Sequence, residues 1–146
     1  MGAGPYPNVA LFEAANRIMT DLVILYGVRW LLRHRVFPFE RYSVEYGHEN
    51  NEHHDIIAEA EGRVLIGEAF NVAPSFFAIK RNSAVRKLRQ SSVRASYRMI
   101  MCNADAVRGS YAPKLHDREF MVLVNIGSGD ASVMPHPTPE LTRNPR

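Results

Sequence analysis

Two carboxylates, Asp55 and Glu68, stand on two neighbouring apolar runs, residues 55–60 and 63–72. The runs are separated by Glu61-Gly62, and such an X-Gly pair between apolar runs predicts a tight β-hairpin. The register of that hairpin places Asp55 directly opposite Glu68. Like charges at that separation repel each other, so the pair predicts either a bound cation or a carboxyl with a raised pKa. Because all the ligands are oxygens, the expected ion is Mg²⁺ or Mn²⁺.

The two acids also have a plainer interpretation. A one-residue slip of the hairpin moves every side chain of a strand to the other face of the sheet. Asp55 then lies at a frayed strand end and Glu68 points to water. In that case the chain is an α/β binding protein with two ordinary surface acids.

A basic helix is expected directly after the hairpin. Pro74-Ser75 is a helix-start signal, and Lys80 and Lys87 project along one edge of the helix that follows. Residues 80–98 contain no acid and seven basic residues: Lys80, Arg81, Arg86, Lys87, Arg89, Arg94 and Arg98. This concentration of positive charge is typical of a surface that binds a nucleic-acid backbone, and the candidates besides Lys80 are Arg81, Arg86, Lys87, Arg89 and Arg94. A solvated helix face that balances acids elsewhere in the chain explains the same run.

With this pair of acids and this helix, the chain resembles the restriction-endonuclease-like, or PD-(D/E)XK, nuclease superfamily. Its members carry an acidic residue at the start of one strand, then (D/E)-x-K on the next strand, then a helix. Asp55 matches the first acid, with His54 where the family often has Pro, and Glu68 matches the second. The third position departs from the pattern, because Glu68-Ala69-Phe70 has Phe in place of Lys.

The resemblance implies a metal-dependent phosphodiester hydrolase that acts on nucleic acid, with DNA favoured. Asp55, Glu68 and the carbonyl of Ala69 would ligate the metal ion. Some members carry the working lysine on the following helix, which assigns that role to Lys80 first and to Lys87 second. With Phe in the lysine position, a catalytically inactive nuclease fold that serves as a nucleic-acid-binding or assembly subunit is the alternative.

Two further residues are candidates for the same site. Members of the family often carry an acid on the first helix that points into the cleft, and Glu13 has that place here, although an i,i+4 ion pair with Arg17 explains Glu13 equally well. His54 is expected in a solvated loop from which it contacts the substrate.

Composition limits the class of protein. The chain has 146 residues, of which 46% are hydrophobic and 23% charged, with a formal net charge of +3, as in an ordinary globular domain. Cys102 is its only cysteine, so no internal disulfide forms. The longest apolar run, residues 22–32, is interrupted by Arg29 and is too short to span a bilayer. We expect a cytoplasmic protein that does not bind membranes, and its oligomeric state is open, with a homodimer as one candidate.

The order of elements predicts an α/β fold, a mixed α+β sheet flanked by helices with an αβββαβ core. A nuclease-like domain is expected over residues 1–126 and an irregular tail over residues 127–146. The expected elements are a helix over 9–26, a strand within 36–47 that is firm from Arg41, the hairpin, the basic helix, a strand over 97–102, a crossover over 103–119 and a strand over 120–126. Gly27 either ends the first helix or lies inside it, because the apolar spacing resumes at Val28.

Overall fold

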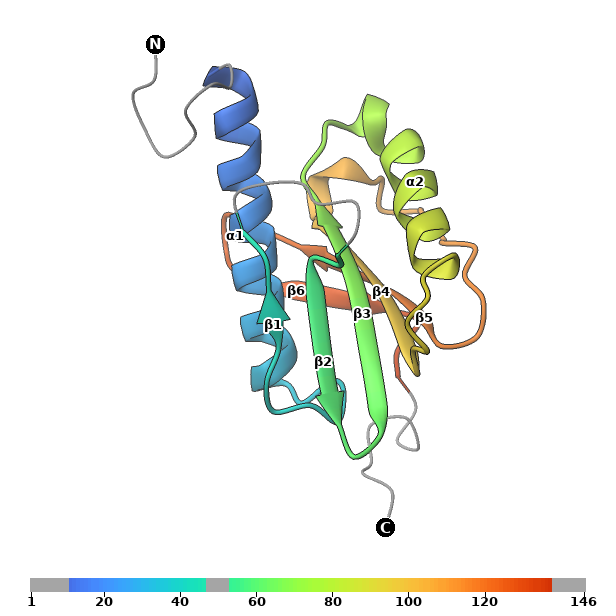
Figure 1. Ribbon diagram of the computed structural model, residues 1–146. Helices are drawn as coiled ribbons and strands as arrows, with labels where there is room; N and C mark the ends of the chain where they lie inside the picture. Colours follow the sequence, from blue (N-terminus) through green and yellow to red (C-terminus); the bar gives the residue numbers. More distant parts are fainter. Residues whose placement is uncertain (1–10, 47–52, 138–146) are drawn as a thin grey trace.

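A six-stranded mixed sheet with one long helix on each face forms the protein (Figure 1). The computed structural model describes residues 11–46 and 53–137. The helices are α1 (Leu11–Arg33) and α2 (Phe77–Arg89), with short 3-10 turns η1 (Pro74–Phe76) and η2 (Ala104–Ala106). The strands are β1 (Ser43–Val44), β2 (Ile56–Ala60), β3 (Arg63–Phe70), β4 (Tyr97–Asn103), β5 (Glu119–Val124) and β6 (Ala131–Met134). The predicted class, a mixed sheet flanked by helices, is confirmed.

The strands lie in the sheet in the same order as in the chain, from β1 to β6. The pairs β3–β4 and β4–β5 are parallel, and the other neighbouring pairs are antiparallel. Parallel neighbours need a crossover, and α2 with the 3-10 turn before it connects β3 to β4. The end of β3 therefore leads directly into the basic helix.

The hairpin of β2 and β3 has the predicted turn and register. Glu61 and Gly62 have φ values of 52° and 78°, and two positive values in succession are what a type I′ turn requires. Ala60 pairs with Arg63, and the ladder runs back to Ile56 opposite Gly67. The next pair in this register is Asp55 and Glu68.

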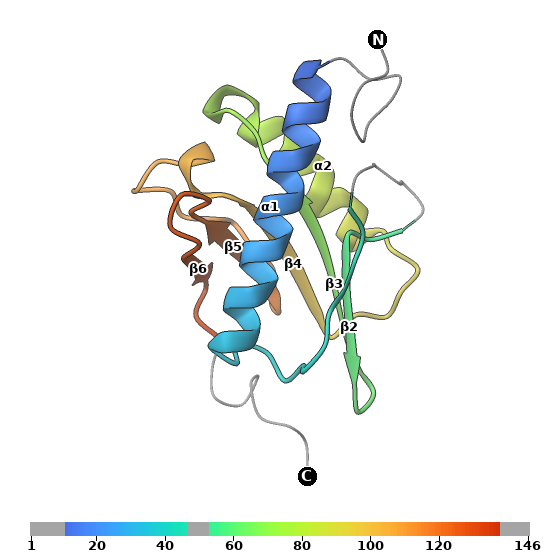
Figure 2. The same ribbon diagram turned by 90° about the vertical axis from the view of Figure 1, so that its left-hand side faces the viewer.

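Each face of the sheet carries its own apolar core, because side chains alternate along a strand. On one face α1 contributes Val23, Ile24 and Leu31, which pack with strand residues such as Met99 and Val122. On the other face α2 contributes the buried residues Phe77, Ala84, Val85 and Leu88. Figure 2 shows α1 crossing the near face of the sheet while α2 lies behind it.

Helix α1 continues past Gly27, so of the two alternatives open at this residue, an end of the helix or a glycine inside it, the structure has the second. A Cβ on Gly27 would lie 2.3 Å from the sulfur of Met101 and 3.1 Å from Val124 Cγ2. The glycine is thus retained for close packing of the helix on β4 and β5, and the apolar spacing continues to Leu31. Residues 9 and 10, where the helix was expected to begin, lie outside the described part of the chain.

Two predicted strand boundaries also change. The strand expected within 36–47 is confined to the two residues of β1, although the N–H of Glu45 still bonds to the carbonyl of Asp55 at 2.9 Å. The expectation of an irregular segment from residue 127 is wrong for β6, which pairs with β5 after a turn at Gly129. An edge strand bonds through its backbone on one side only, so it needs no long apolar run. Residues 138–146 are not described.

Within the described ranges, neither helix combines the length and the apolar character that crossing a bilayer requires.

Candidate active site

Helices α1 and α2 both border a cavity at the end of the sheet where β2 begins and β3 ends. Its volume is about 80 Å³. Its walls are formed by Asn16, Arg17, Thr20, Asp21, Ile24, Glu45, Asp55, Ala69, Phe70, Asn71 and Lys80. Three residues predicted for the site, Asp55, Ala69 and Lys80, therefore lie around one space although they come from separate elements.

Asp55 is held at this cavity by the backbone of the neighbouring strand. The N–H of Ala69 donates to Asp55 Oδ2 at 2.9 Å. Burial raises the pKa of Asp55 to about 6, with smaller upward contributions from the charges of Glu68 and Glu45. The bond from Ala69 and the charge of Lys87 act in the opposite direction, to lower that pKa. Burial is thus the main reason that ionisation of Asp55 is disfavoured.

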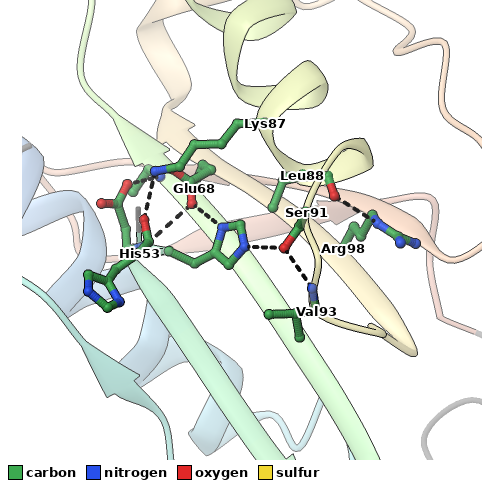
Figure 3. Close-up of polar contacts among 10 residues, drawn as sticks. His53, Glu68, Lys87, Leu88, Ser91, Val93 and Arg98 are labelled. Carbon is green, nitrogen blue, oxygen red and sulfur yellow. Dashed lines mark hydrogen bonds and ion pairs between the residues drawn. The ribbon is translucent and has the colours of Figure 1, made fainter. Parts of the chain in front are cut away.

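Glu68 lies beside the cavity and is not among the residues that line it. It is 6% exposed, and Lys87 of α2 reaches it with Nζ 2.7 Å from Oε1 (Figure 3). The other oxygen, Oε2, lies 2.8 Å from Nδ1 of His54 and 3.4 Å from the backbone nitrogen of Asp55. Lys87 also donates to the carbonyl of His53 at 2.7 Å. Lys87 therefore pairs with Glu68 and also acts through its charge on Asp55, whereas Lys80 lines the cavity of Asp55.

His54 is buried rather than solvated, which corrects the expectation that it contacts substrate from a loop. Its exposed fraction is 8%, and its Nε2 lies 2.7 Å from Oγ of Ser91. Ser91 Oγ in turn accepts the N–H of Val93 at 3.2 Å, as Figure 3 shows. In the neutral tautomer that satisfies both contacts, Nδ1–H donates to Glu68 and Nε2 accepts the hydroxyl proton of Ser91. His54 thus connects Glu68 to the segment that follows α2.

Phe70, which stands in the lysine position of the family pattern, is a core residue. It is 6% exposed and packs in the apolar cluster under α2, with its ring 6.1 Å from that of Phe77. An ammonium group at this position would lie among apolar side chains, where its desolvation is costly. The cationic side chains that line the cavity are Arg17 of α1 and Lys80 of α2.

On α1 the acid that lines the cavity is Asp21, whereas Glu13 is exposed in the first turn and does not line it. Asp21 belongs to a stripe at helical spacing, with Arg17, Thr20 and Ile24, and this stripe forms one wall. The polar side of the helix was visible in the sequence. Its alignment with the end of β3 depends on tertiary packing, as does the position of Glu45 in the same wall.

Much of the basic run is occupied by contacts within the protein. Arg89 forms two hydrogen bonds with the carboxylate of Glu119, at 2.7 and 2.8 Å, and Arg98 donates to the carbonyl of Leu88 at 3.1 Å. Arg81 donates to the carbonyl of Lys114 at 2.8 Å. Arg86 and Arg94 are exposed. The run thus balances acids elsewhere in the chain in part, and keeps some cations at the surface.

The chemistry of the cavity fits a hard divalent cation. Three acidic residues line it, namely Asp21, Glu45 and Asp55, and oxygen donors are those that Mg²⁺ and Mn²⁺ prefer. A cation beside Asp55 would lower its raised pKa and return it to the ionised form. Across residues 11–46 and 53–137, no three His, Cys, Asp or Glu side chains converge in a ready-made metal-binding group.

Comparisons with protein-family models, with curated proteins and with solved structures find no match for this chain. A function therefore has to rest on the order of elements and on the geometry of the site. The order is α1, three antiparallel strands, α2 and then β4, which is parallel to β3.

Proposed function

We propose that this chain is a metal-dependent phosphodiester hydrolase that acts on nucleic acid. The supporting observation is that Asp55 lies beside Glu68, with its backbone nitrogen 3.4 Å from Glu68 Oε2, while Ala69 and Lys80 line the same cavity as Asp55. Two carboxylates across a hairpin repel each other, and a shared cation removes that repulsion. The order of elements, with a lysine-bearing helix directly after the hairpin, supports the same function.

Each residue then has a distinct role in phosphodiester hydrolysis. Asp55 and Glu68 hold Mg²⁺ or Mn²⁺, and the carbonyl of Ala69 adds a third oxygen. When bound, the ion supplies an activated water and positive charge at the phosphoryl oxygens. Lys80 orients the attacking water and stabilises the negative charge that develops as the leaving oxygen departs.

Glu68 has to exchange one partner in order to bind metal. His54 is buried and bonded on both sides of its ring, so it retains Oε2. Lys87 has a flexible stem and a side chain that is 26% exposed, so it is the partner able to withdraw from Oε1. Metal and Lys87 thus compete for one oxygen of Glu68.

The same ion pair favours a second candidate function. Lys87 neutralises Glu68 without any metal, as expected for a nuclease fold that has lost catalysis and binds nucleic acid as a subunit. The exposed cations Arg86 and Arg94 would hold the phosphate backbone in either case, because phosphate contacts position a chain without reading its sequence.

A cleavage assay separates the two functions. Supercoiled plasmid and circular single-stranded DNA are incubated with Mg²⁺ or Mn²⁺ and with the wild type, Asp55→Ala, Lys80→Ala or Glu13→Ala. Glu13→Ala is the matched control, since it removes an exposed acid outside the cavity.

The hydrolase predicts cleavage by the wild type and by Glu13→Ala. It also predicts a rate about 10²- to 10⁴-fold lower in Lys80→Ala, the range for loss of a group that acts in proton transfer, and loss of metal-supported cleavage in Asp55→Ala. Salt-sensitive binding of DNA without cleavage by any sample supports the subunit instead. If the wild type neither binds nor cleaves DNA, both proposals are overturned.

A further inference from the structure

Helix α2 forms a ridge beside the cavity, and two exposed apolar side chains lie at its start, Phe76 at the end of η1 and Ile79 in the first turn of α2. Phe76 is 59% exposed and Ile79 is 70% exposed. Phe76 lies four residues before Lys80, so the two side chains lie on the same side of the helix. An exposed aromatic ring thus stands next to the residue proposed to meet the reacting phosphate.

A second cavity, of about 260 Å³, lies on the other side of this ridge. Its walls are Phe77, Ala78, Arg81 and Asn82 from α2, and Tyr111, Ala112 and Lys114 from the segment after η2. An engineered apolar cavity of about 150 Å³ in another protein admits benzene, so this space is large enough for a nucleobase. Figure 1 shows the segment after η2 passing along α2, on the side away from α1.

The wall of the second cavity combines aromatic and cationic groups without an acidic residue among those that line it. The rings of Phe77 and Tyr111 meet edge to face at 5.2 Å. The guanidinium of Arg81 is fixed between the carbonyl of Lys114, at 2.8 Å, and Oδ1 of Asn82, at 3.1 Å. Proteins that bind single strands use this combination of stacking rings and cations along the backbone.

A base pair inside a duplex cannot use these groups. Its faces are covered by the neighbouring pairs, so neither Phe76 nor the second cavity can receive them until the base leaves the stack. An unpaired strand has both base faces accessible. The exposed ring of Phe76 and the second cavity are therefore expected to favour an unpaired strand over a duplex.

We propose that the nucleic acid crosses the α2 ridge as an unpaired strand. One phosphate lies at the cavity of Asp55, a base stacks on Phe76, and a following base enters the cavity between α2 and residues 111–114. The width of a helix, about 10 Å, corresponds to about three stacked nucleotides at roughly 3.4 Å each, so one strand spans both cavities. The proposal rests on the proposed function for its ligand and adds the strand state of the substrate.

The test is fluorescence anisotropy of one labelled oligonucleotide, single-stranded or annealed to its complement, without divalent metal so that nothing is cut. The variants are Phe76→Ala and Arg81→Gln. The control is Leu25→Ala, which removes an apolar side chain that is 50% exposed on α1, on the other face of the sheet. Both Phe76 and Leu25 are exposed enough for their alanine variants to fold.

We expect the wild type to bind the single strand at least tenfold more tightly than the duplex. Phe76→Ala should weaken single-strand binding about 5- to 150-fold, the range measured for loss of one base–aromatic stack. Arg81→Gln should weaken it as well, and Leu25→Ala should leave it unchanged.

Equal affinity for the two strand states, or full affinity in Phe76→Ala, overturns the proposal. The wild type can prefer the single strand, and Phe76→Ala can weaken that binding, while Mg²⁺ and Mn²⁺ support no cleavage. That result supports the proposed strand path and contradicts the hydrolase. Absence of all nucleic-acid binding by the wild type overturns the proposed strand path, and it overturns the hydrolase as well if Mg²⁺ and Mn²⁺ support no cleavage.

Discussion

His54 is the residue that orients Glu68, through one bond to Oε2 and another to Ser91. Replacing it with Ala leaves a buried carboxylate oxygen short of a donor, which costs about 1–3 kcal/mol of unfolding free energy. Residues that orient metal ligands typically account for 10- to 100-fold in metal affinity, so we expect Mn²⁺ binding to weaken by that factor.

The measurement for His54 is titration calorimetry with Mn²⁺, with urea unfolding alongside. His54→Gln, which can donate one hydrogen bond, should recover part of the Mn²⁺ affinity that His54→Ala loses. Equal Mn²⁺ affinity in the wild type and His54→Ala would show that the histidine only supports packing.

Asp55 makes stability depend on pH in a direction unusual for a carboxyl. Its folded pKa of about 6 lies above the value near 4 of an unfolded aspartate. Its contribution to stability is therefore fully present below pH 4 and is lost as the pH rises through 6. Asp55→Asn does not titrate, so at pH 7–8 its unfolding free energy should exceed that of the wild type by on the order of 1–3 kcal/mol, and it should melt at a higher temperature. The two proteins should converge near pH 4.

Saturating Mn²⁺ should reverse that order, because only the wild type then gains binding energy. A difference between the two melting temperatures that does not vary with pH would contradict the assigned pKa.

At the scale of elements, the β2–β3 hairpin followed from local sequence, because Glu61-Gly62 satisfies the two positive φ values of its turn. The existence of α2 followed from Pro74-Ser75 and the apolar spacing. The length of α1 did not, since local sequence left open whether Gly27 ends the helix or lies inside it, and only the packing on β4 and β5 shows that it lies inside. β6 was missed because an edge strand is formed by pairing with β5, which local composition does not report.

The roles of the basic residues 80–98 also could not be predicted from local sequence, because several of them pair with residues distant in the chain. Arg89, expected to contact nucleic acid, bonds to Glu119, which is 7% exposed, and this bond lowers the pKa of Glu119 against the upward effect of burial. That stabilisation is present above the unfolded pKa of a glutamate and is lost as the pH falls through the folded value.

We therefore expect Arg89→Ala to lower the unfolding free energy by about 1–2 kcal/mol at pH 7, since the exposed side of the pair is screened by solvent. Its affinity for nucleic acid should not change. Arg86→Ala, on the exposed side of the same helix, should leave the unfolding free energy unchanged and should weaken nucleic-acid binding in a salt-dependent way. Urea unfolding and anisotropy measure the two effects, and a loss of affinity in Arg89→Ala that matches that of Arg86→Ala would restore Arg89 to the binding surface.

At the scale of the whole molecule, the site exists because two helices on opposite faces of one sheet reach the same end of it. The sequence placed Asp55, Glu68 and Ala69 together through a single turn. It could not bring in Asp21, Glu45 or the fixed contacts of His54, which depend on how α1, β1 and α2 pack. The metal-binding hypothesis thus follows from the sequence of one hairpin, whereas the proposed path of the substrate depends on the packing of the whole fold.

The central claim is that Asp55 and Glu68 share a divalent cation, and a crystal structure with Mn²⁺, read by anomalous scattering, tests it most directly. The account predicts one Mn²⁺ peak about 2.1 Å from an oxygen of each carboxylate. It also predicts that Lys87 has withdrawn from Glu68 while His54 has stayed in place. A Mn²⁺ ion bound elsewhere, or an intact Lys87–Glu68 pair at saturating metal, would contradict it.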